Sequence, residues 1–290
     1  MSRALIPLLL MFIGWSSTTA AIAADPAQDY VDAYLTMFPS RATAAGLYAT
    51  DGRLEVLDQS HREQWIAFNE ATRIALQKAL EAEPDPASRL DLELLMRQVQ
   101  QELLEWHNQD RPRTDPLFWA DVLGQSTVYL ALRRDRPAAT RLSFAADRTE
   151  QIPRLVSEAL KALSNARDGQ IVPERARAAG ERLRALAEFY RHGLPSAEGA
   201  SRALARRLQR GGASAARAIE KLAARVEQLA ATAQADFRLG ANYDARFRIV
   251  TGIKTPVSQV LSEARRELAD KRQEAAAYGR GVWPQFYPDR

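Results

Sequence analysis

The chain has 290 residues, of which 40 are Lys or Arg and 36 are Asp or Glu, so its formal net charge is +4. It contains no Cys, which excludes disulfides, thiolate catalysis and every zinc site that uses Cys. Nucleic-acid binding needs a concentrated basic face, but acidic residues alternate with Arg along the predicted helices. We therefore expect no nucleic-acid binding. A chain of this length can bury enough apolar surface to fold without disulfides.

The first residues have the layout of a secretory signal peptide. A single Arg precedes an apolar run over residues 4–15, and small residues follow it. The run is about half of the roughly 20 residues that a membrane span needs, so we favour cleavage over a stable membrane anchor. We predict a signal peptide over residues 1–23, with Ala21 and Ala23 at an A-x-A site and Ala24 as the first mature residue. No Cys follows the site, so the mature protein is predicted to be periplasmic or secreted and not a lipoprotein.

Three helices are predicted in the first part of the mature chain. Apolar spacing indicates a short helix over Tyr30–Phe38 and then a long helix that ends at the Pro-Asp-Pro break of residues 84–86. An S-x-x-E capping box, formed by Ser60 and Glu63, is expected to open the long helix. The third helix carries one apolar stripe over residues 92–106.

The central stretch, residues 115–163, begins with aromatic residues and continues through a charged Arg-Arg-Asp-Arg segment that ends at Pro137. An amphipathic helix is predicted after Pro153, because apolar residues recur there at the spacing of one helix face. The stripe consists of Ile152, Leu155, Val156, Ala159, Leu160 and Leu163. No residue of this stretch has an obvious catalytic role.

The remaining elements are indicated by Pro, Gly and capping residues. They are helices over residues 173–192, 196–212 and 213–237, a short aromatic segment over 240–252, and a last helix from Pro256. The pair Gly211 and Gly212 is expected to separate the second of these helices from the third. Thr255 is expected to cap the last helix, with Pro256 at the first helical position.

The fold class follows from what these patterns share. No segment alternates between apolar and polar residues over the length of a strand, and no repeat of fixed period is visible. The connections between predicted helices are short, and no change of composition marks a domain boundary. We therefore predict an all-α fold, a single domain over residues 24–290 built as an array of long antiparallel helices.

Sequence motifs for catalysis, cofactors or metals are not found. A zinc pair on one helix needs His at positions i and i+4, and none of His61, His107 and His192 is followed by such a partner. Nucleophile-elbow and phosphate-loop motifs are missing from the sequence as well. We therefore assign no catalytic, cofactor-binding or metal-binding residue, and we expect no cofactor in this chain.

Four residues are candidates for a binding groove: Tyr129, Arg133, Tyr243 and Arg246. Tyr and Arg are the side chains that commonly hold a carboxylate or a peptide backbone. A simpler interpretation places the tyrosines at the edge of the core and pairs the arginines with Asp. We prefer the simpler interpretation, although the residue types are compatible with both.

Three segments, taken in order, resemble a known family. They are FPSRATAAGLYATDGRLEVL, DPLFWADVLGQSTVYLALRRDRPAATRLSFAADRTEQIPRLVSEA and FRLGANYDARFRIVTG. These segments are similar to the N-terminal half of domain-of-unknown-function family 885, a large bacterial family of exported proteins. The resemblance covers nearly the whole mature chain, from about Asp29 to the last helix.

This resemblance implies a helical protein that is similar to zinc metallopeptidases. In full-length members, a C-terminal motif of H-E-x-x-P-G-H-H type would hold zinc and supply the general base. The present sequence has no such motif, so zinc is expected only in full-length relatives. Our first hypothesis is that the chain is the N-terminal, non-catalytic half of a metallopeptidase-like protein, shortened relative to its family and inactive alone.

The alternative hypothesis is a complete periplasmic binding or interaction protein that uses the family scaffold without enzymatic activity. We favour the first hypothesis because Trp283, Phe286 and Tyr287 make the last residues unusually apolar for a solvated terminus. It implies a C-terminal half or a peptide ligand as the partner. It also implies self-association when the chain is produced alone, because apolar surface would be uncovered.

Overall fold

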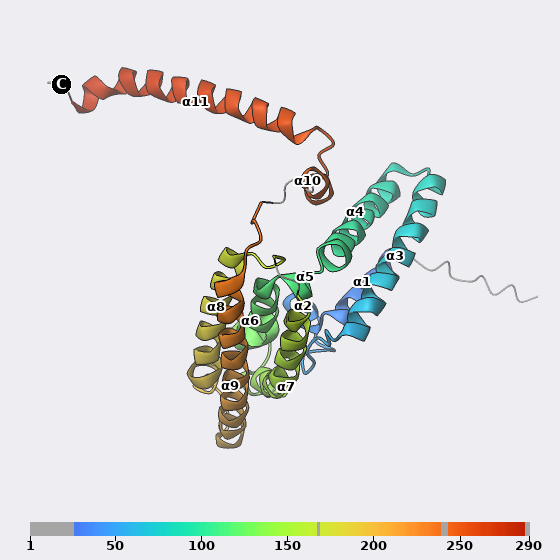
Figure 1. Ribbon diagram of the computed structural model, residues 1–290, viewed down its shortest axis with the longest axis vertical. Coiled ribbons are helices and arrows are strands. Elements are labelled where there is room, and N and C mark those ends of the chain that lie inside the picture. The colour runs from blue at the N-terminus through green and yellow to red at the C-terminus, as the bar shows by residue number, and fades with distance from the viewer. Residues whose placement is uncertain (1–25, 167–168, 239–242, 288–290) are drawn as a thin grey trace, which may run out of the picture.

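The computed structural model describes residues 26–166, 169–238 and 243–287 (Figure 1). Within these three ranges the chain forms helices joined by loops, and no strand is present. The prediction of a single all-α domain is therefore confirmed. The predicted signal peptide, with its cleavage residues Ala21, Ala23 and Ala24, lies outside the described residues.

The helices fall into two groups along the chain. The first group consists of α1 (Pro26–Met37), α2 (Pro39–Ala44), α3 (Gln59–Ala82), α4 (Pro86–Leu103), the π-helical turn η1 (Leu104–Asn108) and α5 (Arg111–Thr114). The second group consists of α6 (Pro116–Leu132), α7 (Ala138–Ser164), α8 (Pro173–Glu188), the π-helical turn η2 (Phe189–Gly193), α9 (Arg202–Thr232), α10 (Tyr243–Thr251) and α11 (Val257–Phe286).

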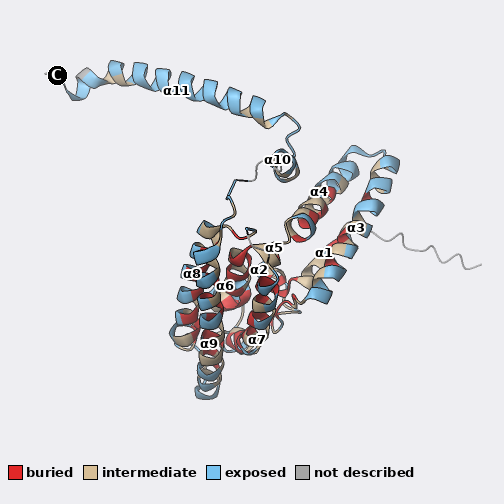
Figure 2. Cartoon of the chain, in the orientation of Figure 1, coloured by how far each residue is buried: buried red, intermediate tan, exposed pale blue. Residues whose placement is uncertain are grey.

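The body of the molecule is a bundle of α6, α7, α8 and α9. Helix α9 packs along both α7 and α8, and α6 packs against the same two helices. The buried residues lie on the inner faces of these helices, as the red regions of Figure 2 show. Trp119 and Tyr190 are fully buried, and the Tyr190 hydroxyl donates to the Leu123 carbonyl oxygen at 3.2 Å. Burial raises the pKa of Tyr190 to about 12, so this hydroxyl stays protonated as a donor.

A hairpin of α3 and α4 projects from the bundle, and α1 packs against α3 (Figure 1). A row of buried aromatic rings joins the hairpin to the bundle. The ring centroid of Phe38 lies 5.4 Å from that of Trp65 and 5.8 Å from that of Trp106. Trp106 lies 5.4 Å from Phe118, the first bundle residue of the row. Such ring pairs contribute about 0.5–1.5 kcal/mol each beyond their buried area, so they fix the hairpin in place.

Helix α7 begins at Ala138, well before the helix predicted after Pro153, and Pro153 lies inside it. A proline within a helix removes one backbone hydrogen bond and costs about 3 kcal/mol. The residues of α7 before and after the proline are buried, and this burial offsets the cost. Local sequence rules do not include such tertiary contacts. The predicted stripe is confirmed: Leu160 is partly buried, and the fully buried members are Ile152, Leu155, Val156, Ala159 and Leu163.

Helix α9 runs without a break from Arg202 to Thr232, so the predicted separation at Gly211 and Gly212 is wrong. A Cβ atom added at Gly212 would overlap the carbonyl oxygen of Tyr190 in η2. The glycine therefore allows two helical segments to approach closely, and it does not end a helix.

Two predicted helix caps are also wrong. Asp58, and not Ser60, caps α3, since its Oδ1 accepts the backbone N–H of His61 at 3.0 Å. Helix α11 has Pro256 at its N-cap and no capping side chain, so Thr255 does not cap it. A capping side chain acts only when the preceding loop places it within reach of the first backbone N–H groups, and the sequence alone does not show that path.

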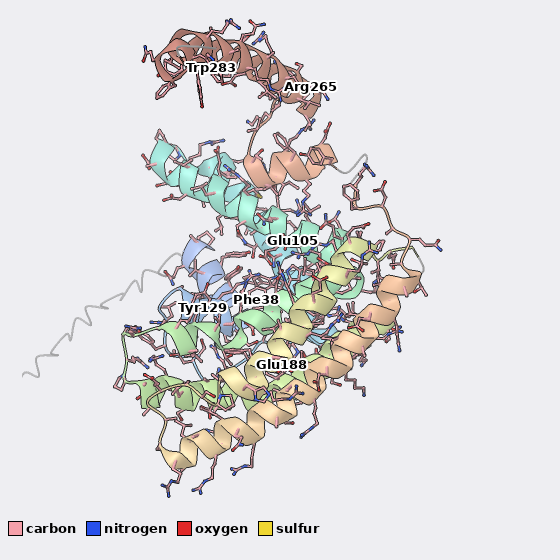
Figure 3. The ribbon with its side chains drawn as sticks, turned by 90° about the vertical axis from the view of Figure 1, so that its left-hand side faces the viewer. Phe38, Glu105, Tyr129, Glu188, Arg265 and Trp283 are labelled. Carbon is pink, nitrogen blue, oxygen red and sulfur yellow. The ribbon has the colours of Figure 1, made fainter. Side chains whose placement is uncertain are left out.

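Helix α11 extends away from the bundle (Figure 1), and Figure 3 shows Arg265 and Trp283 along it from another side. None of its residues whose exposure is described is buried. Trp283, Phe286 and Tyr287 are 49%, 74% and 47% exposed. Apolar residues recur along this helix at the spacing of one face, and in the described part of the chain they are not buried either: Val257, Val260, Leu261, Ala264, Leu268 and Ala275.

Candidate functional site

A small cavity lies where α2, the loop that follows it, α5 and α6 come together. Its volume is about 120 Å³. Two arginines, two carboxylates and two phenyl rings line it, together with a hydroxyl and an amide: Arg41, Arg111, Glu55, Asp121, Phe38, Phe118, Ser40 and Gln125. Groups of opposite charge beside apolar rings are suited to a small ligand that carries both a carboxylate and an N–H donor.

Two of the larger hollows are less suited to a specific ligand than this cavity. One of about 600 Å³ lies between α1 and α3 and has a mostly apolar lining that includes Trp65 and Phe68. The other, of about 320 Å³, contains Asp110, whose φ of 45° is unusual for a residue other than glycine. Asp110 is already paired with Arg62 at 3.8 Å and with Arg113 at 2.6 Å, so its charge is neutralised within the chain.

The position of α2 beside the cavity is set by Arg148 of α7, a fully buried arginine. Its guanidinium donates to the Ser126 carbonyl oxygen at 2.8 Å, to the Pro39 carbonyl oxygen at 3.1 Å and to Thr43 Oγ1 at 2.6 Å. Thr43 donates its own hydroxyl to Asp51 Oδ1 at 2.6 Å. Burial lowers the pKa of Arg148, and the carboxylates of the network act in the opposite direction. This network ties α2 and the loop after it to α6 and α7.

Glu55 is a buried carboxylate in the cavity lining, only 2% exposed. Its Oε1 accepts the backbone N–H of Ser40 at 3.0 Å and also the Ser40 hydroxyl. Its Oε2 has no hydrogen-bond partner among the described residues. Leaving a buried charged oxygen unpaired is costly, so a ligand that donates a hydrogen bond to Oε2 would gain stability here.

Arg41 lies at another side of the cavity. Its guanidinium carbon is 4.5 Å from the centroid of the Phe38 ring, and Nη1 donates to the Tyr34 hydroxyl. The same nitrogen lies 4.0 Å from Glu102 Oε1, at the limit of an ion pair. The Arg41 side chain is 41% exposed, so a ligand can reach its remaining donors.

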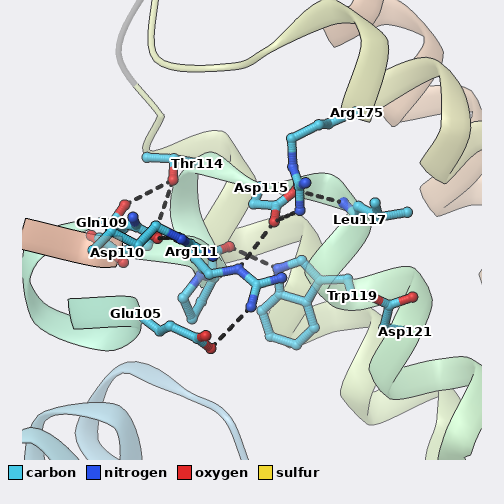
Figure 4. Close-up of polar contacts among 12 residues, drawn as sticks. Glu105, Gln109, Asp110, Arg111, Thr114, Asp115, Leu117, Trp119, Asp121 and Arg175 are labelled. Carbon is cyan, nitrogen blue, oxygen red and sulfur yellow. Dashed lines mark hydrogen bonds and ion pairs between the residues drawn. The ribbon is translucent and has the colours of Figure 1, made fainter. Parts of the chain in front are cut away.

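Arg111 is held in a fixed orientation by two carboxylates, as Figure 4 shows. Its Nε donates to Asp115 Oδ2 at 3.1 Å, and its Nη1 donates to Glu105 Oε2 at 3.0 Å. Asp115 also accepts from Arg175 Nε at 2.9 Å and caps α6 by accepting the Leu117 N–H at 3.1 Å. Asp115 and Glu105 occupy Nε and Nη1 and fix the guanidinium, so a ligand would bind at Nη2 with little entropic cost.

Glu102, next to this site, gives a testable pH dependence. Desolvation raises the pKa of its buried carboxyl, although Trp65 Nε1 donates to Oε2 at 3.0 Å. The folded chain therefore binds this proton more tightly than the unfolded chain, and the resulting stability is lost as pH rises through the raised pKa. We expect Glu102→Gln to reduce the loss of unfolding free energy that occurs as pH rises above the ordinary glutamate pKa, measured by urea titrations at a series of pH values. Glu70→Gln, on an exposed ion pair of α3, controls for the removal of one carboxylate.

The residues predicted from sequence to form a groove lie as two separate pairs. Tyr129 is 40% exposed near the end of α6 (Figure 3), and Arg133 pairs with Asp135 and donates to the Thr43 carbonyl oxygen at 2.5 Å. Tyr243 is 47% exposed at the start of α10, and Arg246 donates to Gln109 Oε1 at 2.9 Å. Gln109 precedes the start of α6 and Arg133 follows its end, a distance of roughly 25 Å along 17 helical residues. The structure does not bring the four side chains to one place, and ligand binding by either pair stays a prediction.

The site described above was not predicted from the sequence. Arg41, Arg111 and Glu55 belong to no motif, and they meet only because α2, its loop and α5 converge. One signal was available: Glu55 is the acidic residue of a Leu-Glu-Val-Leu run in which both leucines are buried. A charged residue inside an apolar run indicates a buried polar contact.

The side chains that could ligate zinc are scattered over the described part of the chain. No three His, Asp or Glu side chains within the described ranges are grouped so that they could hold a metal ion. His61 and His192 lie beside single carboxylates, Asp58 at 2.9 Å and Glu188 at 3.6 Å. These residues do not provide the three protein ligands that a catalytic zinc requires.

Comparison with known proteins identifies the family. The fold and the site define an all-α protein with a helical bundle, a projecting hairpin and a charged cavity where α2 and α5 meet α6. The family model described as "Bacterial protein of unknown function (DUF885)" matches residues 39–287, and the chain belongs to this family. No curated protein matches the chain.

A solved structure shares the fold. It is described as "The structure of a putative lipoprotein of unknown function from Shewanella oneidensis" and aligns with a TM-score of 0.71 at 20% sequence identity. The alignment covers 90% of the present chain and 48% of the other chain, so the chain spans about half the length of that protein. In the described residues, no helix is long and apolar enough to cross a membrane.

Proposed function

We propose that the chain is the N-terminal half of an exported protein of zinc-metallopeptidase type, and that it contributes one wall of a peptide-binding cleft. Three observations support the proposal. The sequence resembles such proteins, the chain belongs to the family, and the solved relative has about twice the length that the match covers. Export is supported by the predicted signal peptide and by the description of that relative as a lipoprotein.

The cavity between α2 and α6 carries the binding part of the proposal. Arg41 and Arg111 each present a guanidinium, the group best matched to a carboxylate. Glu55 and Asp121 present oxygens that accept hydrogen bonds from an amide or an ammonium group. A volume of about 120 Å³ admits the polar end of one residue and not a whole peptide. The cavity therefore suits the terminal residue of a peptide substrate, with its carboxylate on the arginines.

Peptide titrations test this role. A tripeptide of alanine with a free carboxylate is expected to bind the purified chain, and its C-terminally amidated form is expected to bind more weakly. Losing one charge-assisted hydrogen bond costs about 1.5–3 kcal/mol, which corresponds to a roughly tenfold to hundredfold higher Kd. The same loss is expected for Arg41→Gln and for Arg111→Gln, measured by calorimetry or by NMR shifts.

Arg73→Gln is the matched control, because Arg73 forms an exposed ion pair with Glu70 on α3, away from the cavity. It should leave the Kd of the free tripeptide unchanged. Equal affinity for the free and amidated tripeptides would contradict the assignment of the arginines to a carboxylate.

Complementation separates the two hypotheses about the whole protein. The chain mixed with the separately produced C-terminal half of a family relative is expected to give peptidase activity that chelation removes. Here the chain would supply substrate binding, and the other half would supply the metal ligands. Peptide binding without activity in any such mixture would favour the alternative, a binding protein that uses the scaffold alone.

A further inference from the structure

Helix α9 carries a concentration of positive charge that the interleaved sequence conceals. Between Arg202 and Thr232 it has seven basic side chains and two acidic ones, a net charge of +5. The whole chain has a net charge of +4, so the remaining residues together are close to neutral. The basic character of the protein therefore resides in one helix.

The exposed cations of α9 lie on a single face. At about 100° per residue, they fall within an arc of roughly 100° that is centred opposite the buried side chains of the helix. We call this the cationic face of α9; it consists of Arg202, Arg206, Arg210, Arg217 and Lys221. The buried side consists of Leu208, Gly212, Ala215, Ala216, Ile219, Leu222, Ala223 and Val226. Figure 3 shows long side chains with nitrogen tips projecting outward from this helix.

The acidic residues of α9 do not neutralise the face. Glu220 lies at the edge of the arc and is paired with Arg191 of η2 at 2.5 Å. Glu227 lies outside the arc, further around the helix axis, and is paired with Arg184 of α8 at 2.9 Å. Both glutamates are therefore engaged by neighbouring helices of the bundle.

No residue of the cationic face has a hydrogen bond or an ion pair through its side chain within the described chain. Arg207, one position outside the face, contrasts with them because it binds Asp147 and Glu150 of α7, each at 2.7 Å. Arg202 and Arg206 stand four residues apart, as do Arg217 and Lys221, and like charges at this spacing destabilise a helix. The hydrogen bonds from Arg207 lower the pKa of Glu150 and the charge of Arg210 adds to this effect, but that carboxylate is already bound by Arg207. The other four cations have no acidic partner within the described chain. This unfavourable arrangement favours a counter-charge outside the chain.

The shape of the face restricts the partner. The face extends over about 28 Å along a straight helix, and no cavity of the site above adjoins it. The positions between the cations carry small side chains such as Ala203 and Ala213, so a flat surface can approach closely. The helix has no aromatic residue, which a single-stranded nucleic acid would use for stacking. A flat surface of negative charge, in contrast, can be bound by cations on one face of a helix without any aromatic side chain.

We propose that the cationic face of α9 docks on an anionic phospholipid surface through the phosphate groups of the lipids. The choice of a membrane rests on the export in the proposed function, since an exported bacterial protein meets lipid surfaces. No apolar side chain larger than alanine lies in the arc, so binding is electrostatic and weakens as salt rises. Such docking is peripheral and would hold the bundle with α9 against the lipid headgroups.

Vesicle sedimentation tests the docking. The full chain is incubated with extruded vesicles of phosphatidylcholine alone or of phosphatidylcholine with phosphatidylglycerol. We expect binding to the mixed vesicles at low salt, at least tenfold weaker binding to the neutral vesicles, and loss of binding at high salt. The triple variant Arg206→Glu, Arg210→Glu and Arg217→Glu is expected to lower the partition coefficient at least tenfold.

A variant of equal charge change separates the face from the net charge. Arg265→Glu, Arg266→Glu and Arg272→Glu place the same three reversals on exposed α11 and are expected to change the partition less than twofold. Equal losses in the two variants would overturn the proposal, and so would equal binding to neutral vesicles. A DNA duplex bound more tightly than the mixed vesicles at the same salt would overturn the choice of partner.

Two further measurements separate a loss of lipid docking from unfolding and from a loss of peptide binding. Thermal unfolding of the α9 variant should show no loss of stability, because the replaced side chains are exposed and repel one another. Peptide titration of the same variant should give the Kd of the unchanged chain, since α9 does not line the cavity. Failure of docking is thus distinguishable from failure of the peptide-binding role.

Discussion

Replacing Arg148 with methionine is expected to lower the free energy of unfolding by about 3–5 kcal/mol, as measured by urea or guanidinium titration. Methionine is a long, unbranched apolar side chain that has no donor. The carbonyl oxygens of Ser126 and Pro39 would then lose a buried donor, and so would Thr43 Oγ1. Glu55 and Asp51 would also lose the buried cation that faces them, which is costly for buried carboxyl groups. Removal of one side of a buried network costs more than the network contributes as a whole.

Two variants check the origin of this loss. Arg177→Met removes an exposed guanidinium that pairs with Glu174 at 3.3 Å, and it should change stability by less than about 1 kcal/mol. Adding Glu55→Gln to Arg148→Met should recover part of the loss, because one unpaired buried charge is removed. A loss below about 1 kcal/mol for Arg148→Met would contradict the role given to this residue.

The Arg148 variant should also affect the candidate site. Arg148 holds α2 through Pro39 and Thr43, and α2 carries Ser40 and Arg41 to the cavity. Even where the variant stays folded at low temperature, it is expected to bind the free-carboxylate tripeptide more weakly. Stability and binding are thus coupled through one buried side chain.

The elements that the sequence predicts well are those set by local chemistry. The break at residues 84–86 is confirmed, since α3 ends at Ala82 and α4 begins at Pro86 behind the capping side chain of Asp85. A proline at the first helical position and an aspartate before it act through neighbouring backbone groups alone. Such signals do not depend on the remainder of the fold.

The elements that the sequence misjudges are those where distant contacts override local preference. Pro153 lies inside α7, and Gly212 lies inside α9, because both helices are packed along their whole buried faces. The sequence predicts two short helices in place of α9, and this error also hides the shared face of its cations. Two short helices do not share a face, so the alignment of Arg206 with Arg217 could not be recognised from the sequence.

The candidate site was beyond sequence reasoning for a similar reason. Glu55 lies in an extended loop without periodicity, and its orientation depends on contacts with Ser40 and on the packing of α7. Arg111 belongs to a four-residue helix whose position depends on Asp115 and Glu105. The residue types are visible in the sequence, but their convergence is a property of the tertiary structure.

Replacing Gly212 with alanine is expected to destabilise the protein by about 2–3 kcal/mol, although alanine is the better helix former. The added Cβ would overlap the Tyr190 carbonyl oxygen and would lie 3.4 Å from Pro195 Cγ. The overlapped atom belongs to the backbone of η2, so no side-chain rotation can relieve the clash. Helix α9 would have to move away from η2 and lose packing across the bundle.

The adjacent Gly211 provides the matched control for this prediction. A Cβ atom there would lie 3.4 Å from Thr149 Cγ2 and 3.6 Å from Glu150 Cγ, both ordinary contacts. Gly211→Ala is therefore expected to stabilise the protein by up to about 1 kcal/mol, through helix propensity alone. Thermal unfolding of the two variants should move in opposite directions. If both alanines stabilised the protein, the close approach of α9 to η2 would not be what requires glycine at position 212.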